Sequence, residues 1–298
     1  MIIILEQLFL LFSFMLVGYI LGKLKIVDTA HTKILSAFAV NIFVPCTVFK
    51  SFSSNFTAEY LAAYYPFVIA SAVVVIILVI IAHFASKLFS RSDYERAIYR
   101  YSLIVPNYGY MGYALAEGLY GAAGLLNFIV FSLPVSVYTY TVGYSMLTKR
   151  ELSLKKLLNP IMVALALGAV FGLTGIKVPD IVTELLSKGS GCMAPISMLL
   201  AGLTISEFDI KSLINEKKTY IAALLRLAVI PFAVMLVLKP LGMPELTRTA
   251  VLFYSMPCGL NTIVFPRLID ENCMIGAKLA FVSNLCAIAT IPLILNLI

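Results

Sequence analysis

Ten long apolar segments, separated by short charged loops, limit this chain to one class of fold. The segments span residues of about 2–22, 32–53, 60–86, 97–118, 123–147, 157–175, 181–205, 218–238, 247–269 and 274–298. Each is long enough to cross a bilayer core of ~30 Å as a helix. Only 12% of the residues are charged and 61% are hydrophobic, whereas about 25% of the residues of a soluble domain are charged. The sequence therefore predicts an all-α polytopic membrane protein with ten transmembrane helices and excludes a soluble enzyme.

The basic residues of the loops indicate how these segments cross the membrane. Of the 22 Lys and Arg residues, 16 lie in loops that follow odd-numbered segments. The loops after even-numbered segments hold Lys50, Lys177, Lys188, Lys239 and Arg248. Because positive charge collects on the cytoplasmic side, we expect a multi-pass protein of the inner (plasma) membrane with both termini outside. The net charge of +7 is spread over short loops without a dense basic block, so no nucleic-acid partner is expected.

Glycines and prolines of the first half of the chain recur in the second half about 150 positions later. The matched pairs are Gly18 with Gly168, Gly22 with Gly172, Pro45 with Pro195 and Pro106 with Pro257. A unit of five helices is odd, so a second copy enters the membrane upside down, as in the inverted repeats of secondary transporters. The sequence predicts one five-helix repeat over 1–147, a cytoplasmic linker over 148–156 and an inverted repeat over 157–298.

Two of the segments contain proline and glycine at their centres. The interruptions read Val105-Pro-Asn-Tyr-Gly109 and Met256-Pro-Cys-Gly259. Proline removes a helical donor and clashes with the preceding turn, and irregular backbone survives in a bilayer only where protein or a wet cavity covers it. We expect the two breaks to cross near the membrane midplane, with half-helix N-termini that favour an anion. Two ordinary proline kinks are the alternative.

Asparagines in and near the breaks are the strongest candidate ligands. An asparagine amide offers two N–H donors and a carbonyl acceptor without burying a charge, although each amide also suits a tie to the backbone freed by a kink. The predicted substrate-binding residues are Asn107, Pro106, Tyr108, Gly109, Pro257, Cys258, Gly259, Asn261 and Asn41. No catalytic residue, metal ligand or cofactor is predicted. Arg226, in the segment 218–238, is expected to reach the cytoplasmic surface or to pair with another group.

The two breaks resemble motifs of a known family. Pro106-Asn107-x-x-x-Met111-Gly112-x-x-Leu115, followed by Tyr120-Gly121, resembles the fourth-span motif of the auxin efflux carrier family in its plant PIN-type members. Pro257-x-Gly259, followed by Phe265, resembles that family's ninth-span motif. Cys258, where the plant carriers have glutamine, and the loop of about ten residues between the fifth and sixth segments fit a short prokaryotic-type member rather than a plant carrier of auxin.

The resemblance implies a fold similar to that of sodium/proton antiporters and bile acid symporters. Helices 1, 2, 6 and 7 would form a scaffold, and helices 3–5 and 8–10 a transport unit with both crossover helices, which moves like an elevator. Substrates in the family are organic anions, namely auxin in plants and malonate or malate suggested for bacterial members. Asn107 would be the carboxylate ligand.

The function expected from the sequence is secondary transport of a small organic anion, a carboxylate. The main alternative is a sodium-coupled organic anion symporter of the bile acid type, which needs clustered acidic or carbonyl ligands for sodium. A channel or a sensor is a further alternative. An intramembrane enzyme is not expected, because His31 and His83 lie near loops and no pair of aspartates lies within the segments. The expected partners are the anion and the bilayer, and the Gly-x-x-x-Gly motifs at Gly18 and Gly168 permit either a homodimer or internal packing.

Overall fold

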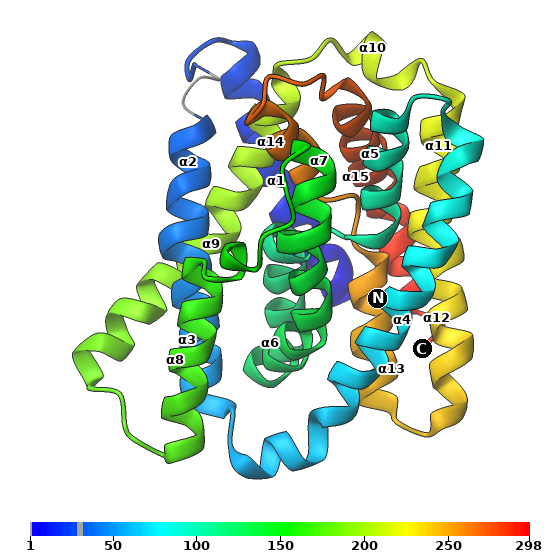
Figure 1. Cartoon of the computed structure of the whole chain (residues 1–298). Helices are drawn as coiled ribbons and strands as arrows, with labels where there is room; N and C mark the ends of the chain where they lie inside the picture. The colour runs from blue at the N-terminus through cyan, green and yellow to red at the C-terminus, as the bar shows by residue number, and fades with distance from the viewer. Residues whose placement is uncertain (1, 29–31) are drawn as a thin grey trace.

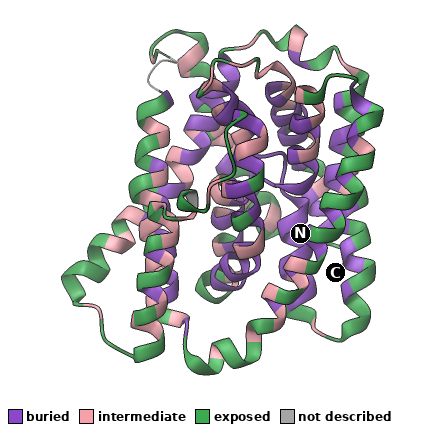
Figure 2. Ribbon diagram, viewed as in Figure 1, coloured by how far each residue is buried: buried purple, intermediate pink, exposed green. Residues whose placement is uncertain are grey.

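The protein is an all-helical bundle with an apolar outer surface. The computed structural model describes residues 2–28 and 32–298, apart from the side chain of Lys156, and this part of the chain contains no β-strand (Figure 1). Seven of its described helices are long and apolar enough to cross a membrane: Ile2–Lys23, Thr32–Asn55, Ala58–Phe89, Tyr108–Thr148, Asp180–Ser206, Lys217–Leu241 and Met274–Leu295. Many of their large apolar side chains are exposed, and Figure 2 shows exposed residues along the outer helices around a buried centre. An apolar exterior of this extent is typical of a surface that faces lipid.

Several predicted segments consist of more than one helical piece, where η marks a short π- or 3₁₀-helix. The pieces are α1 (Ile2–Lys23), α2 (Thr32–Phe38), η2 (Ala39–Phe43), α3 (Val44–Asn55), α4 (Ala58–Phe89), α5 (Asp93–Ile104), η3 (Tyr108–Gly112), α6 (Tyr113–Tyr138), η4 (Thr139–Gly143), α7 (Tyr144–Thr148), η5 (Leu154–Leu157), α8 (Pro160–Thr174), α9 (Asp180–Ser206), α10 (Ile210–Ile214), α11 (Lys217–Leu224), η6 (Leu225–Val229), α12 (Ile230–Leu238), η7 (Lys239–Leu241), α13 (Pro244–Ser255), α14 (Asn261–Arg267) and α15 (Met274–Leu295).

The two predicted breaks are confirmed, and they explain why fewer than ten long helices are found. α5 ends before Val105, whose backbone is extended at φ −103° and ψ 112°, and α13 ends before Met256, which is extended at φ −67° and ψ 145°. The first of these segments is therefore split into α5 and the start of a longer helix, and the second into α13 and the short α14. α6 also runs through Gly121, whose φ of 67° kinks it, so that it joins two predicted segments, and α8 has only 15 residues. Ten membrane crossings stay a prediction.

Helices from the two halves of the chain pack against each other in pairs. α1 lies along α9 and α3 along α8, whereas α4 packs on α5 and α6, α11 on α15, and α12 on α13. In Figure 1, α3, α8 and α9 lie on the left, and α4, α11, α12 and α13 on the right. The motif glycines contact helices of the same chain, because a Cβ atom at Gly18 would meet Leu199 and one at Gly172 would meet Phe56. These glycines therefore serve internal packing, and a homodimer stays a prediction.

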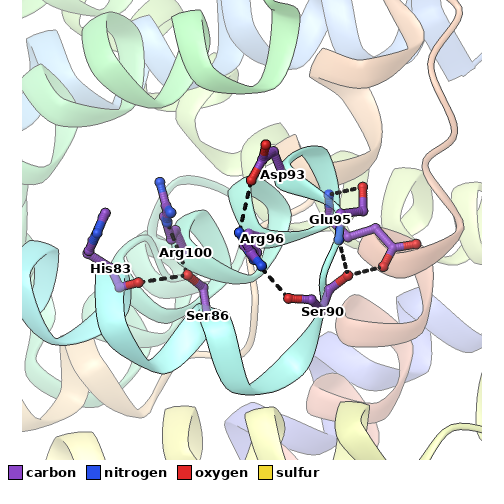
Figure 3. Close-up of polar contacts among 8 residues, drawn as sticks. His83, Ser86, Ser90, Asp93, Glu95, Arg96 and Arg100 are labelled. Atoms are coloured by element: carbon purple, nitrogen blue, oxygen red, sulfur yellow. Dashed lines mark hydrogen bonds and ion pairs between the residues drawn. The ribbon is translucent and has the colours of Figure 1, made fainter.

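Polar contacts fix the start of the first broken segment to the end of α4 (Figure 3). Ser90, in the turn, donates a hydrogen bond to Glu95 and accepts one from the Ser92 N–H. The Arg96 Nε donates to the Ser90 carbonyl at 2.8 Å, and the Arg100 Nε donates to the Ser86 hydroxyl at 3.0 Å. Because α5 is held along α4 from its first turn, its C-terminal end at residues 101–104 has a defined position inside the bundle.

Candidate functional site

The two breaks lie against each other in the interior of the protein. The Asn107 N–H donates to the Pro257 carbonyl at 2.8 Å, and Pro106 pairs with Cys258 as an isolated antiparallel bridge. The Cys258 N–H donates to the Ser283 hydroxyl of α15 at 2.9 Å. These bonds satisfy part of the backbone that the prolines release from helical pairing, and we call this contact between residues 105–107 and 256–260 the crossing.

Four helix ends converge on the crossing with opposite polarity. α5 and α13 reach it with their C-terminal ends, whereas η3, which continues into α6, and the short α14 begin there. The first N–H groups of a helix have no partner inside the helix and carry partial positive charge. The long helix formed by η3 and α6 therefore presents unpaired N–H groups, beginning at Tyr108, to whatever lies in front of the crossing.

A cavity of about 790 Å³ opens beside the crossing. Its wall includes the predicted residues Asn41, Pro106, Asn107, Tyr108, Gly109, Gly259 and Asn261. Pro257 and Cys258 do not line the cavity, because the Pro257 carbonyl bonds to Asn107 and Cys258 is fully buried against Ser102 and Ser283. A Cβ atom at Gly109 would meet nothing within 4 Å, so the backbone at this point is open to the cavity.

Asn107 differs from the other two candidate asparagines because its amide has no partner. The side chain is 2% exposed, and neither Nδ2 nor Oδ1 has a hydrogen-bond partner among the described residues. Asparagine at a helix N-cap normally accepts from the first turn, yet the Asn107 side chain forms no such cap. In contrast, the Asn41 amide donates to the Ala37 carbonyl at 2.8 Å, and the Asn261 amide donates to the Tyr101 hydroxyl at 2.9 Å. An unpaired buried polar group costs about 1–3 kcal/mol, which a ligand can recover.

Several cavity residues are not among those predicted from the sequence. They are Ser36, Ser136, Tyr140 and Thr204, and Asp28, Lys33, Glu207 and Arg267 among the charged residues. Tyr110 and Tyr113, which together with Tyr108 suggest an aromatic lining from the sequence, also line the cavity. Ser136 donates to the Tyr108 hydroxyl at 3.0 Å. Ser136 and Tyr140 are four residues apart and share one helical face, which is the one sequence signal that distinguishes them. Ser36 and Thr204 are isolated hydroxyls in apolar segments and give no signal.

A charged pair bridges two elements of the cavity wall. Arg267, the last residue of α14, donates from Nη1 to Glu207 Oε1 at 3.1 Å and from Nη2 to Oε2 at 2.5 Å. Glu207 follows the last residue of α9. A bidentate guanidinium–carboxylate pair fixes both distance and orientation, so it ties the helix after the second break to α9.

One of the two expectations for Arg226 is wrong. It was expected to reach the cytoplasmic surface or to pair with another group. Its side chain is fully buried and does not reach the surface, and its Nη1 atom donates to the Leu103 carbonyl. It lies nine residues after the start of α11 at Lys217, which is about 13 Å along a helix, and η6 faces α13 and α15. This distance from Arg226 to the start of α11 exceeds the length of an arginine side chain, so the guanidinium does not reach the surface there. Of the two histidines, His83 is exposed on α4, and His31 lies outside the described residues.

Comparison with known proteins relates the chain to membrane transporters. The family described as membrane transport protein matches residues 3–156 and 149–295. An uncharacterized transporter of Methanocaldococcus jannaschii is 23% identical over 290 residues, which cover 93% of each chain. The uncharacterized transporter YfdV of Escherichia coli K12 is 24% identical over 306 residues, which cover 94% of this chain and 92% of YfdV.

Proposed function

The chain belongs to the membrane transport protein family, the family of the auxin efflux carriers, and from this premise we propose that it is a secondary transporter of a small organic anion, a carboxylate. The family is one of membrane transporters and not of enzymes, so the cavity is a site for binding and release. The observation that carries the proposal is the unpaired, buried amide of Asn107 at the crossing.

The chemistry of this amide favours a carboxylate. One carboxylate oxygen accepts from Asn107 Nδ2, and the other accepts from the unpaired N–H groups at the start of the helix that follows. Charge-assisted hydrogen bonds of this kind are stronger than neutral ones. The Asn107 Oδ1 atom accepts from a hydroxyl group or a water molecule that accompanies the carboxylate. A neutral binding group also lets the anion leave again, because no buried ion pair has to be broken.

The packing supports an alternating-access movement of the elevator type. We propose ten transmembrane helices in two inverted repeats, with a scaffold of α1, α2–α3, α8 and α9 and a transport unit that holds both breaks. Within the scaffold, α1 packs along α9 and α3 along α8, so each pair joins the two halves of the chain. Residues of both proposed parts line the cavity, because Asn41 and Thr204 belong to the scaffold and Asn107 and Asn261 to the transport unit. The loop charges support a location in the cytoplasmic membrane with both termini outside.

Counterflow of labelled carboxylates in proteoliposomes tests the proposal. We expect vesicles preloaded with an unlabelled mono- or dicarboxylate to take up the labelled compound with a rate that saturates, because each molecule occupies the site in turn. Empty vesicles serve as the control. A flux that rises in proportion to concentration would contradict a carrier and favour a channel, and uptake that requires sodium would favour the symporter of the bile acid type.

The Arg267–Glu207 ion pair provides a test of the elevator movement. It joins α14, in the proposed transport unit, to the end of α9, in the scaffold, so it has to break when the unit moves. A partly exposed pair contributes about 1 kcal/mol or less, so we expect Glu207→Gln to raise the counterflow rate by about two- to fivefold. The exchange Glu207→Arg with Arg267→Glu is expected to restore the original rate.

A matched control pair lies within the transport unit. Lys278 of α15 and Glu216, next to α11, pair at 2.8 Å, and both move together in the proposed elevator. Glu216→Gln is therefore expected to leave the counterflow rate unchanged. An equal acceleration by Glu216→Gln, or no effect of Glu207→Gln, would contradict a movement of α14 relative to α9.

A further inference from the structure

A buried cation that the proposed substrate site does not use lies behind the crossing. Arg226 is the only Lys or Arg among the described side chains that is buried, and it is completely so. It does not line the cavity. Nη1 donates to the Leu103 carbonyl at 3.3 Å, Nε and Nη2 have no partner, and none of the ion pairs among the described residues includes Arg226. A buried charge without compensation is expensive, so its surroundings must offset it in another way.

The last turns of two helices contact this charge. Leu103 belongs to the last turn of α5, and Tyr254, whose ring centroid lies 5.5 Å from the guanidinium carbon, belongs to the last turn of α13. The C-terminus of a helix carries about half a negative charge, so both helix ends favour a cation at this place. The Tyr254 ring adds a cation–π contact.

In transporters with broken helices, the C-terminal ends of half-helices coordinate the coupling cation. In this protein the guanidinium of Arg226 lies at the C-terminal ends of two such half-helices, α5 and α13. We infer that Arg226 is the fixed cation of the crossing, a positioning residue that holds the ends of α5 and α13 together in place of a cation from solution. Leu103 lies four residues before Asn107, and Tyr254 lies three residues before Pro257, whose carbonyl bonds to Asn107. By fixing these two helix ends, Arg226 fixes the position of Asn107. If the proposed function holds, the carboxylate is transported without sodium, because Arg226 takes the place of the coupling cation.

The inference requires that the charge matters more than the hydrogen bond, and two variants separate these contributions. Arg226→Lys keeps a positive charge, whereas Arg226→Gln keeps an N–H donor for the Leu103 carbonyl and removes the charge. Arg248→Gln is the control, because Arg248 lies on the same transport unit but pairs with Glu245 at the surface. The Tm of each full-length purified protein is measured in sodium chloride, in choline chloride, and in choline chloride with a low concentration of guanidinium. Carboxylate counterflow is measured in sodium chloride and in choline chloride.

We expect the wild type and Arg226→Lys to have a Tm and a counterflow rate that do not depend on the salt. Arg226→Gln is expected to have a lower Tm and to lose counterflow at least tenfold. It should regain part of its Tm when sodium replaces choline or when guanidinium is added to choline chloride. The inference is overturned if Arg226→Gln behaves like the wild type, if Arg226→Lys is as impaired as Arg226→Gln, or if no cation raises the Tm of Arg226→Gln. If the wild type exchanges no carboxylate at all, the proposed function fails, while the Tm values still decide the role of Arg226.

Discussion

Asn107→Ala is expected to remove about half or more of the stabilisation that a carboxylate confers on the purified protein. A ligand at 100 times its Kd stabilises the folded state by about 2.7 kcal/mol. The variant loses a hydrogen bond to a charged group, worth about 1.5–3 kcal/mol, so its Kd should rise roughly 10- to 100-fold. At the same ligand concentration the remaining stabilisation is about 0.4–1.4 kcal/mol. The change in Tm across a panel of mono- and dicarboxylates measures it, and the compound that shifts the wild type most identifies the substrate class.

Without ligand, Asn107→Ala has a second and opposite expectation. The amide has no partner in the structure, so its removal leaves no hydrogen bond broken and relieves the cost of a buried polar group. The Tm of the unliganded variant should equal or exceed that of the wild type. A residue that ties the break to a neighbouring helix would behave differently, because its loss would lower the Tm of the unliganded protein.

Asn41→Ala is the matched control in the same cavity. The Asn41 amide already donates to the Ala37 carbonyl one turn earlier, so a carboxylate has less to gain from it. We expect Asn41→Ala to keep most of the carboxylate shift. A shift that survives Asn107→Ala but disappears in Asn41→Ala would move the binding site from the crossing to η2.

The breaks could be predicted from sequence because their cause is local. Pro106 and Pro257 interrupt helical pairing wherever the segments lie in the bundle. Their mutual contact was expected from the symmetry of their positions, but the hydrogen bond from the Asn107 N–H to the Pro257 carbonyl depends on how two distant segments pack. Likewise, residue type does not distinguish Asn41, Asn107 and Asn261, and only the family resemblance favours Asn107. The structure separates the three by the partners of their amides.

Burial of a charge was harder to predict than the presence of the membrane segments. Composition and length indicate which residues lie at membrane depth, but not whether a side chain points to lipid, to a neighbouring helix or along the helix to the surface. For Arg226 the sequence left two alternatives open, namely the cytoplasmic surface, which most long cationic side chains prefer, and a partner inside the protein. Its burial depends on the ends of α5 and α13, which no local pattern in η6 reveals. The hydroxyls of Ser36 and Thr204 escaped prediction for the same reason.

Gly202→Ala is expected to have the largest effect on stability, because α9 and α1 touch at this glycine. A Cβ atom at Gly202 would overlap the Met15 carbonyl and approach the Tyr19 N–H, both backbone atoms of α1 that cannot rotate away. Forcing extra volume into a close-packed contact costs about 1–3 kcal/mol, and more where backbone has to shift. We expect the Tm of the purified variant to fall by at least several degrees, as measured by thermal unfolding in detergent.

Gly191→Ala in the same helix supplies a control with the opposite sign. A Cβ atom at Gly191 would meet nothing within 4 Å, and alanine is more favourable than glycine inside a helix by about 1 kcal/mol. The Tm of Gly191→Ala should therefore stay the same or rise. If both variants were equally stable, α1 would not lie against α9 as the structure shows. If Gly202→Ala alone loses stability and counterflow together, the pair α1–α9 has to be intact for transport, as a rigid scaffold requires.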